Sequence, residues 1–148
     1  MSLFSMLFEP SNIKTHRKAA EGAIHLRKIA ATNASIEMNM LLSTYHKAQE
    51  NHEKAYASGN LELAGLYMDG LSIARELIER VERTSSYLMI EIAEHEQQKP
   101  TSASEWEKRT SFELDLRNGM IEVTKQAKKS LDTLSTLNVE SVTKFNLR

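Results

Sequence analysis

The sequence predicts an all-α protein, an elongated antiparallel three-helix bundle in up-down-up order with coiled-coil-like seams. Two observations carry this prediction. The 89 residues between Pro10 and Pro100 contain no proline, the residue that most strongly interrupts a helix. Across these residues, and on to about Leu137, apolar residues recur every three or four positions, which is the period of one helix face.

A first helix is predicted over residues 11–57, because Ser11 and Asn12 are residue types that favour helix N-caps and the apolar spacing begins just after them. Its seam, the line of residues expected to face neighbouring helices, is rich in alanine and is interrupted by Arg27 and His52. The seam consists of two heptad series, Ile24, Ala31, Met38, Tyr45 and His52 in one and Ala20, Arg27, Ala34, Leu41, Ala48 and Ala55 in the other.

A second helix is predicted over residues 61–98, after a turn at Ser58-Gly59-Asn60. Gly59 can take the left-handed conformation that ends a helix, and Asn60 can cap the next one. The heptad pattern of this helix is the most regular in the chain. Its seam is Ala64, Tyr67, Leu71, Ala74, Ile78, Val81, Ser85, Leu88, Ile92 and His95.

A third helix is predicted over residues 104–137. Residues 99–104 break the helical pattern, and two capping-box spacings follow, Ser102 with Glu105 and Ser104 with Glu107. The seam of this helix is Trp106, Leu116, Met120, Val123, Ala127, Ser130, Leu134 and Leu137. The domain organisation is therefore an apolar leader over residues 1–10, a bundle over residues 11–137 and a C-terminal tail over residues 138–148.

The distribution of charge supports antiparallel neighbours, which short connections also favour. An antiparallel pairing of the first two helices places the start of one beside the end of the other. The start of the first helix is basic and the end of the second is acidic, so we expect ion pairs between them. The basic residues are Lys14, Arg17, Lys18, Arg27 and Lys28, and the acidic residues are Glu91, Glu94 and Glu96.

Composition argues against several functional classes. A net charge of −1 and a pI near 6.5 offer no global attraction for nucleic acid, although Lys125 to Lys129 and the basic start of the first helix could contact phosphate. The absence of cysteine excludes disulfides and thiol chemistry. The sequence has no glycine-rich phosphate loop, no Gly-x-Ser-x-Gly and no His-Glu-x-x-His. We therefore expect no enzyme and no cofactor.

A metal site is one alternative. No Glu is followed three residues later by His, which argues against a di-iron carboxylate centre. In the antiparallel register, however, His25 lies near the level of His95, with Glu21 and Glu91 one helical turn from each. Two imidazoles and two carboxylates can bind a divalent ion if they converge. The competing interpretation is a pair of ordinary solvent-facing Glu–His pairs.

The leader contains the most suggestive contact residues. Five of its residues are large and apolar, namely Leu3, Phe4, Met6, Leu7 and Phe8. As a helical turn, the leader could dock into a groove on a partner protein, fold back on its own bundle or rest in a membrane interface. It has neither the basic start nor the long apolar run of a signal peptide, so a cytoplasmic location is expected.

Apolar residues outside the seams predict a second buried face. They exceed what one narrow seam uses, so either the apolar stripe is wide or a partner covers part of it. A homodimer or a different protein partner would each account for them. These residues are Ile73, Leu77, Met89, Ile90, Phe112, Leu114, Ile121 and Leu131.

The sequence thus favours a non-enzymatic helical bundle that acts through protein–protein interaction, as an adaptor, a chaperone-like protein or an assembly subunit. The alternatives are a metal- or small-ligand-binding bundle and a small helical secreted protein. For the latter, Tyr87-Leu-Met-Ile-Glu91 resembles the Tyr-x-x-x-Asp/Glu signal of small proteins exported by the type VII route. It lies within a predicted helix, and the turn at Ser58-Gly59-Asn60 lacks the Trp of that family, so no family is assigned.

Overall fold

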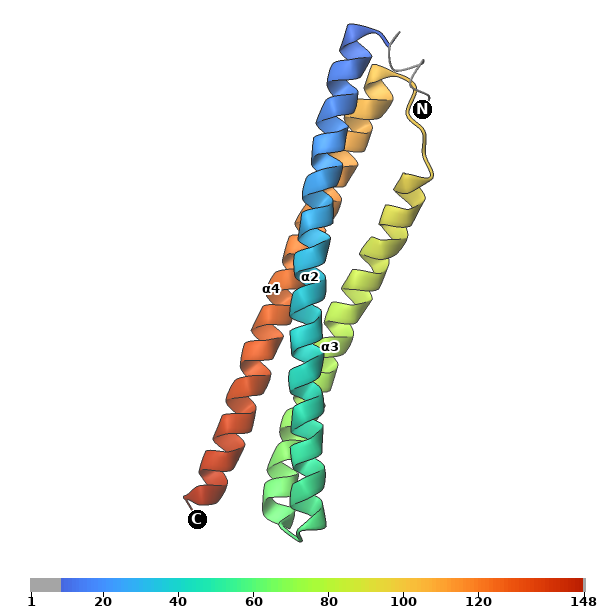
Figure 1. Ribbon diagram of the computed structural model, residues 1–148. Helices are drawn as coiled ribbons and strands as arrows, with labels where there is room; N and C mark the ends of the chain where they lie inside the picture. Colours follow the sequence, from blue (N-terminus) through green and yellow to red (C-terminus); the bar gives the residue numbers. More distant parts are fainter. Residues whose placement is uncertain (1–8, 148) are drawn as a thin grey trace. The chain divides into compact units, whose positions relative to one another are not determined.

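The computed structural model describes the chain from Glu9 to Leu147, apart from the side chains of residues 137, 138 and 140. This part of the chain forms three helices, α2 (Ser11–Ala57), α3 (Leu61–Glu96) and α4 (Ala103–Asn146), and contains no strand (Figure 1). The predicted all-α class and three-helix bundle are confirmed. None of these described helices combines the length and apolar content needed to cross a membrane.

The chain divides into two compact units, and each unit contains a segment of every helix. Unit 1 comprises Met1–Asn33 and Ser85–Glu122, and unit 2 comprises Ala34–Thr84 and Val123–Arg148. The division falls within each helix and not between helices. Each unit is therefore a short three-helix bundle with its own core.

In unit 2, the predicted turn at Ser58-Gly59-Asn60 reverses the chain between α2 and α3. Gly59 has a φ of 79°, the left-handed conformation in which glycine carries no steric penalty. The Asn60 amide donates to the Ala55 carbonyl at 2.9 Å, and its side-chain oxygen accepts from the Leu63 amide at 3.3 Å. These bonds satisfy the last carbonyls of α2 and the first amides of α3, so the two helices run antiparallel here.

In unit 1, contacts between α3 and α4 show that these helices also run antiparallel. The Arg109 guanidinium, near the start of α4, donates to the His95 carbonyl near the end of α3. Further along α4, Gly119 lies against Leu88, which comes earlier in α3. The Glu105 amide donates to the Ser102 hydroxyl at 3.2 Å, so Ser102 is the N-cap of α4, as the first predicted capping box requires. The Glu105 carboxylate accepts from the Thr101 amide at 2.6 Å, one residue before the amide that a capping box uses.

Most residues of the predicted seams form the cores of both units. The exception is the series from Ile24 to His52 on α2, in which only Tyr45 is buried and the other four residues are half-buried. All six members of the series from Ala20 to Ala55 are buried, including Arg27. In the seam of α3, eight of the ten predicted residues are buried, whereas Leu71 and Ser85 are half-buried. In α4, Leu116 to Leu134 follow the prediction, Trp106 is half-buried, and Leu137 lies outside the described side chains.

The predicted end of the third helix is wrong. α4 does not stop at about Leu137 but continues to Asn146, so residues 138–146 belong to the helix and not to a separate tail. No glycine or proline follows Asn138, and an asparagine inside a helix costs only about 0.7 kcal/mol relative to alanine. Ser141 is buried, seven residues after Leu134, so the core-facing period persists to that point.

The helical glycines allow a test of the packing. A Cβ built on Gly65 meets no atom within 4 Å, whereas one on Gly119 would lie 2.8 Å from a Leu88 methyl carbon. We therefore expect Gly65→Ala to stabilise the protein by roughly 0.5–1 kcal/mol through helix propensity alone. Gly119→Ala should gain less or destabilise, because Leu88 is buried and must shift. Urea unfolding would measure both. Equal gains would contradict the Gly119–Leu88 contact.

Candidate partner-binding surface

The outward-facing side of α2 carries a further heptad series, whose large apolar side chains the bundle leaves about half exposed. Leu26 and Ile29 in unit 1 are 45% and 46% exposed, and Ile36 and Met40 in unit 2 are 52% and 50% exposed. Asn33, also exposed, completes the series. The intervals are three, four, three and four residues along one uninterrupted helix. We call these five residues the outer stripe.

The outer stripe is distinct from the seam that α2 buries in its own bundle. With about 100° of rotation per residue, the stripe is centred roughly 110° around the helix from the buried series of Ala23, Arg27, Ala30 and Leu41. Single exposed apolar residues are ordinary on protein surfaces. Four large ones at a/d spacing are instead typical of a helix that packs against another helix.

A buried ion network ties the three helical segments of unit 1 together. Glu113 of α4 is completely buried, and its two carboxylate oxygens accept from two arginines. Arg27 Nε of α2 lies 2.6 Å from one oxygen, and Arg109 Nε of α4 lies 2.9 Å from the other. Arg109 also donates to the His95 carbonyl of α3, and Arg27 Nη2 lies 3.2 Å from Glu96 Oε1 of α3.

The geometry of this network indicates a structural role. A buried ion pair seldom adds net stability over an apolar core, but a charge left without its partner costs several kcal/mol. Alternative registers of these helices would bury such unpaired charges, so we infer that the network selects the observed register. The Arg27–Glu96 bond is also one of the ion pairs expected between the start of the first helix and the end of the second.

The four residues of the predicted metal site do not converge. Glu91 and His95 come together on α3, with His95 Nε2 3.8 Å from Glu91 Oε2. His25 is exposed, and Glu21 binds Arg17 at 2.5 Å instead of meeting the histidines. Among the residues from 9 to 147, no group of three or more acidic or histidine side chains is placed to hold a metal ion. The antiparallel arrangement of the helices is therefore not sufficient to bring these four side chains to a common point.

His95 is a packing residue of the unit 1 core. It is buried, and its ring stacks on Phe112 of α4 with centroids 4.4 Å apart and an interplanar angle of 29°. Its Nδ1 atom is buried without a hydrogen-bond partner among the described residues. The imidazole of His95 thus packs against an aromatic ring of α4 and helps to hold α3 and α4 together.

The predicted contact residues of the leader, Leu3, Phe4, Met6, Leu7 and Phe8, lie outside the described residues. The first described residue, Glu9, is held against α2, because Arg17 Nε lies 3.0 Å from its buried carboxylate. Hydrogen bonds to Glu9 and, to a lesser extent, to Glu21 raise the pKa of Arg17 above its ordinary value.

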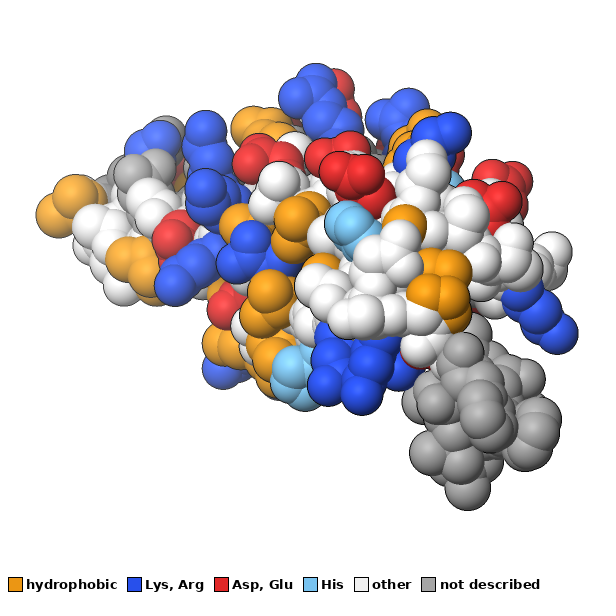
Figure 2. Space-filling model, turned by 90° about the horizontal axis from the view of Figure 1, so that it is seen from above, with side chains coloured by type: hydrophobic (Ala, Val, Ile, Leu, Met, Phe, Trp, Pro, Cys, Tyr) orange, Lys and Arg blue, Asp and Glu red, His pale blue; other side chains and the backbone are white. Residues whose placement is uncertain are grey.

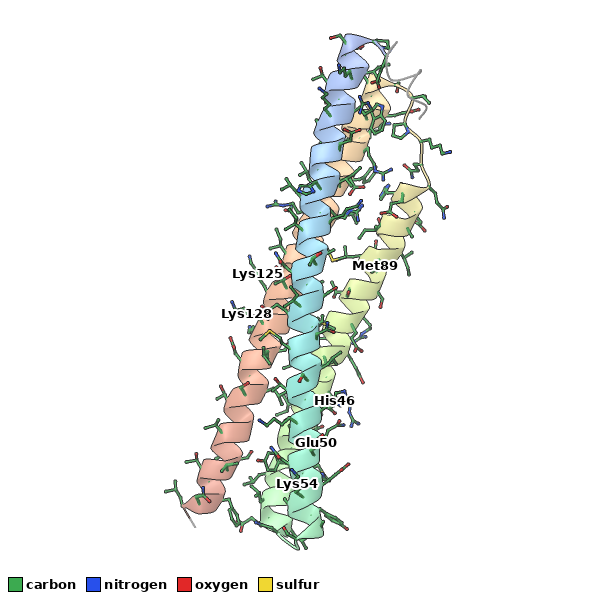
Figure 3. The ribbon with its side chains drawn as sticks, viewed as in Figure 1. His46, Glu50, Lys54, Met89, Lys125 and Lys128 are labelled. Atoms are coloured by element: carbon green, nitrogen blue, oxygen red, sulfur yellow. The ribbon has the colours of Figure 1, made fainter. Side chains whose placement is uncertain are left out.

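Elsewhere on the described surface, charged side chains of both signs lie exposed on the helices. On α2 in unit 2, His46, Glu50 and Lys54 follow one another at one-turn intervals and are exposed, as on an ordinary solvated helix face (Figure 3). In the view of Figure 2, Lys and Arg side chains are interspersed with Asp and Glu.

A shallow groove lies between α3 and α4 in unit 2. Its volume is about 330 Å³, and Ser130 at its floor donates its hydroxyl hydrogen to the Gln126 carbonyl. Arg80 at its edge pairs with Glu76 on its own helix. The groove is lined by Leu77, Arg80, Val81, Gln126, Lys129, Ser130 and Thr133. These residues do not pair a nucleophile with a general base, so the groove suggests no reaction.

Comparisons with protein-family models, with curated proteins and with solved structures found no match to this chain.

Sequence reasoning did not identify the outer stripe. The excess apolar residues it recognised lie on the second and third helices, and of these Ile73, Met89, Ile90, Phe112 and Leu114 are exposed. On the first helix, only the two series assigned to the seam were followed. The missing signal was present in the sequence as the alternating intervals of three and four from Leu26 to Met40.

Proposed function

We propose that this chain is a non-enzymatic helical-bundle protein that works by protein–protein interaction, as an adaptor, a chaperone-like protein or an assembly subunit. In this proposal the outer stripe of α2 is the main contact surface. The observation that carries it is the set of four large apolar side chains, each 45–52% exposed and at a/d spacing. Such a stripe has its apolar surface in water until another helix covers it.

The leader is a second proposed contact element. Its apolar residues Leu3, Phe4, Met6, Leu7 and Phe8 precede Glu9, which is bound to Arg17 on α2. Because Glu9 is bound to α2, the residues that immediately precede it can contact a partner that is bound to the outer stripe of the same helix. We also propose that the protein works in the cytoplasm, which fractionation of cells producing it would check.

Site-specific photo-crosslinking tests the main surface. A photoreactive amino acid replaces Ile29 or Ile36 of the outer stripe in cells that produce the protein. Matched controls replace Ile90 or Ile73 on α3, which are 60% and 50% exposed but do not belong to the stripe. We expect discrete protein adducts from Ile29 and Ile36 and none from the controls, because only a specific partner is held long enough to react.

The identity of the adduct is then read by mass spectrometry. An adduct on one protein, or on another copy of this chain, supports a contact surface at the stripe. Equal labelling at all four positions, or no adduct at Ile29 and Ile36, would overturn the proposal.

A further inference from the structure

We propose that the outer stripe of α2 binds an amphipathic helix of a different protein, one that carries acidic residues beside its apolar residues. This inference rests on the proposed function and names the chemistry of the partner. It depends on three features of α2, namely the width of the stripe, the side of the stripe that stays open and the charges on that side.

The spacing and width of the outer stripe fit a single helix. Leu26, Ile29, Ile36 and Met40 repeat over two heptads, as anchor residues do where one amphipathic helix packs against another. At about 100° of rotation per residue, the stripe covers only roughly 80° of the circumference of α2. A helix that lies in a membrane interface buries a broader apolar face in the lipid. The narrow stripe therefore favours a helix over a lipid surface.

One side of the outer stripe is open to a partner. On the other side Ala23 and Ala30 are buried, because α2 turns there toward its own core. On the open side, the residues next to the stripe are Lys18, His25 and Thr32, and all three are exposed. A partner helix must therefore place its own flanking residues beside this open side of α2.

The open side of α2 is basic, and its positive charges are not neutralised within the described chain. Of the two acidic residues between positions 11 and 49, Glu21 is bound to Arg17 at 2.5 Å and Glu37 is half-buried. Four lysines lie on the open side or continue the stripe, all exposed and none in an ion pair with another described residue. They are Lys14, Lys18, Lys28 and Lys47.

These lysines select the sign of the partner's charge. A helix with basic residues beside its apolar stripe would be repelled by them, whereas acidic residues in the same places would pair with them. Each exposed pair stabilises a complex only weakly, but complementary charge speeds encounter and disfavours partners of the wrong sign. The apolar stripe thus supplies most of the affinity, and the lysines supply the selectivity.

Two synthetic helical peptides of about three heptads test this selectivity. Both carry leucine at the a and d positions, and the e and g positions are all glutamate in one peptide and all lysine in the other. Fluorescence anisotropy measures the binding of each peptide to the full chain. The net charge of the chain is −1, so a preference for the acidic peptide has to come from local charge.

We expect the acidic peptide to bind at least tenfold more tightly than the basic one at about 0.05 M salt. The difference should shrink at about 0.5 M salt, because salt screens exposed charges. Equal binding of the two peptides, or tighter binding of the basic peptide, would overturn the inference.

Matched charge reversals locate the contact. Lys14→Glu together with Lys18→Glu should weaken binding of the acidic peptide at least fivefold, because two attractive pairs become repulsive. Lys125→Glu together with Lys128→Glu makes the same change in net charge on α4 and should leave binding within about twofold (Figure 3). Equal weakening by the two double variants would show a response to net charge alone and would overturn the inference.

The apolar contribution is tested without a change of charge. Ile29→Ser and Ile36→Ser should each weaken binding of the acidic peptide at least fivefold, because the stripe loses buried apolar area. Ile73→Ser and Ile90→Ser, at exposed positions of α3, should leave it within about twofold. If the α3 variants weakened binding as much, the peptide would not be bound at the outer stripe and the inference would fail.

Photo-crosslinking and lipid vesicles separate this inference from the proposed function. Adducts from Ile29 and Ile36 to a partner protein, without a preference for the acidic peptide, would refute the acidic partner yet support the proposed function. Vesicles of anionic phospholipid test a membrane as the occupant. If the full chain sedimented with these vesicles, Ile29→Ser abolished that binding and the acidic peptide did not bind, a lipid surface would replace the acidic helix.

Discussion

Glu113→Gln is expected to lower the free energy of unfolding by about 3 kcal/mol, which urea unfolding would measure. The change removes the negative charge between Arg27 and Arg109, both nearly buried, and leaves two guanidinium groups facing a neutral amide. Breaking a buried pair typically costs 3–5 kcal/mol. The lower end is expected here, because Arg27 keeps Glu96 and Arg109 keeps the His95 carbonyl.

A matched control and a combined variant make this prediction specific. Glu76→Gln breaks an exposed pair with Arg80 and should cost less than about 0.5 kcal/mol. Replacing the triad together, as Arg27→Met, Glu113→Leu and Arg109→Met, should leave stability unchanged or higher, because no buried charge then lacks a partner. A loss below 1 kcal/mol for Glu113→Gln would show that its carboxylate is solvated and that the network does not hold unit 1 in register.

Leu41→Ala is expected to lower the free energy of unfolding by about 2–5 kcal/mol. Leu41 of α2 is completely buried in unit 2, as are Tyr45 and Ala48 further along the same helix. Removal of its branched end loses apolar burial and leaves a cavity that helical backbones close only in part. The same denaturant titration gives the value.

Leu61→Ala is the control for this prediction. Leu61, at the start of α3, is 65% exposed, so the same chemical change should cost less than about 0.5 kcal/mol. If both variants lowered the free energy of unfolding by a similar amount, Leu41 would not be buried in the core as the structure places it.

Most of the fold follows from local patterns in the sequence. The proline-free stretch and the heptads identified three helices, and Ser58-Gly59-Asn60 marked the tight turn that the structure confirms. The end of α4 was missed, because Asn138 is only a weak helix breaker and continued burial at Ser141 outweighs its propensity. Local signals place helix starts well when a cap is present, as Ser102 shows, but packing decides where a helix without a breaker ends.

The buried ion network of unit 1 and the outer stripe of α2 were less predictable from the sequence, each for its own physical reason. Arg109 and Glu113 continue the heptad from Trp106 to Leu116, yet charged residues are rarely assigned to a core without knowledge of their partners. The partner of Glu113 across helices, Arg27, lies 86 residues away in sequence. The outer stripe depends on which face of α2 stays uncovered, and two heptad series on one helix look equally core-like until burial is known.

The rate of thiol alkylation at neighbouring positions of α2 tests the central claim most directly, namely that this helix has one buried and one available apolar face. Single-cysteine variants Ile29→Cys and Ala30→Cys place a thiol where the native residues are 46% and 6% exposed. The Ile29→Cys variant should react at least tenfold faster than the Ala30→Cys variant, because the reagent reaches only an exposed thiol. Equal rates, or faster reaction of Ala30→Cys, would contradict the assignment of the two faces.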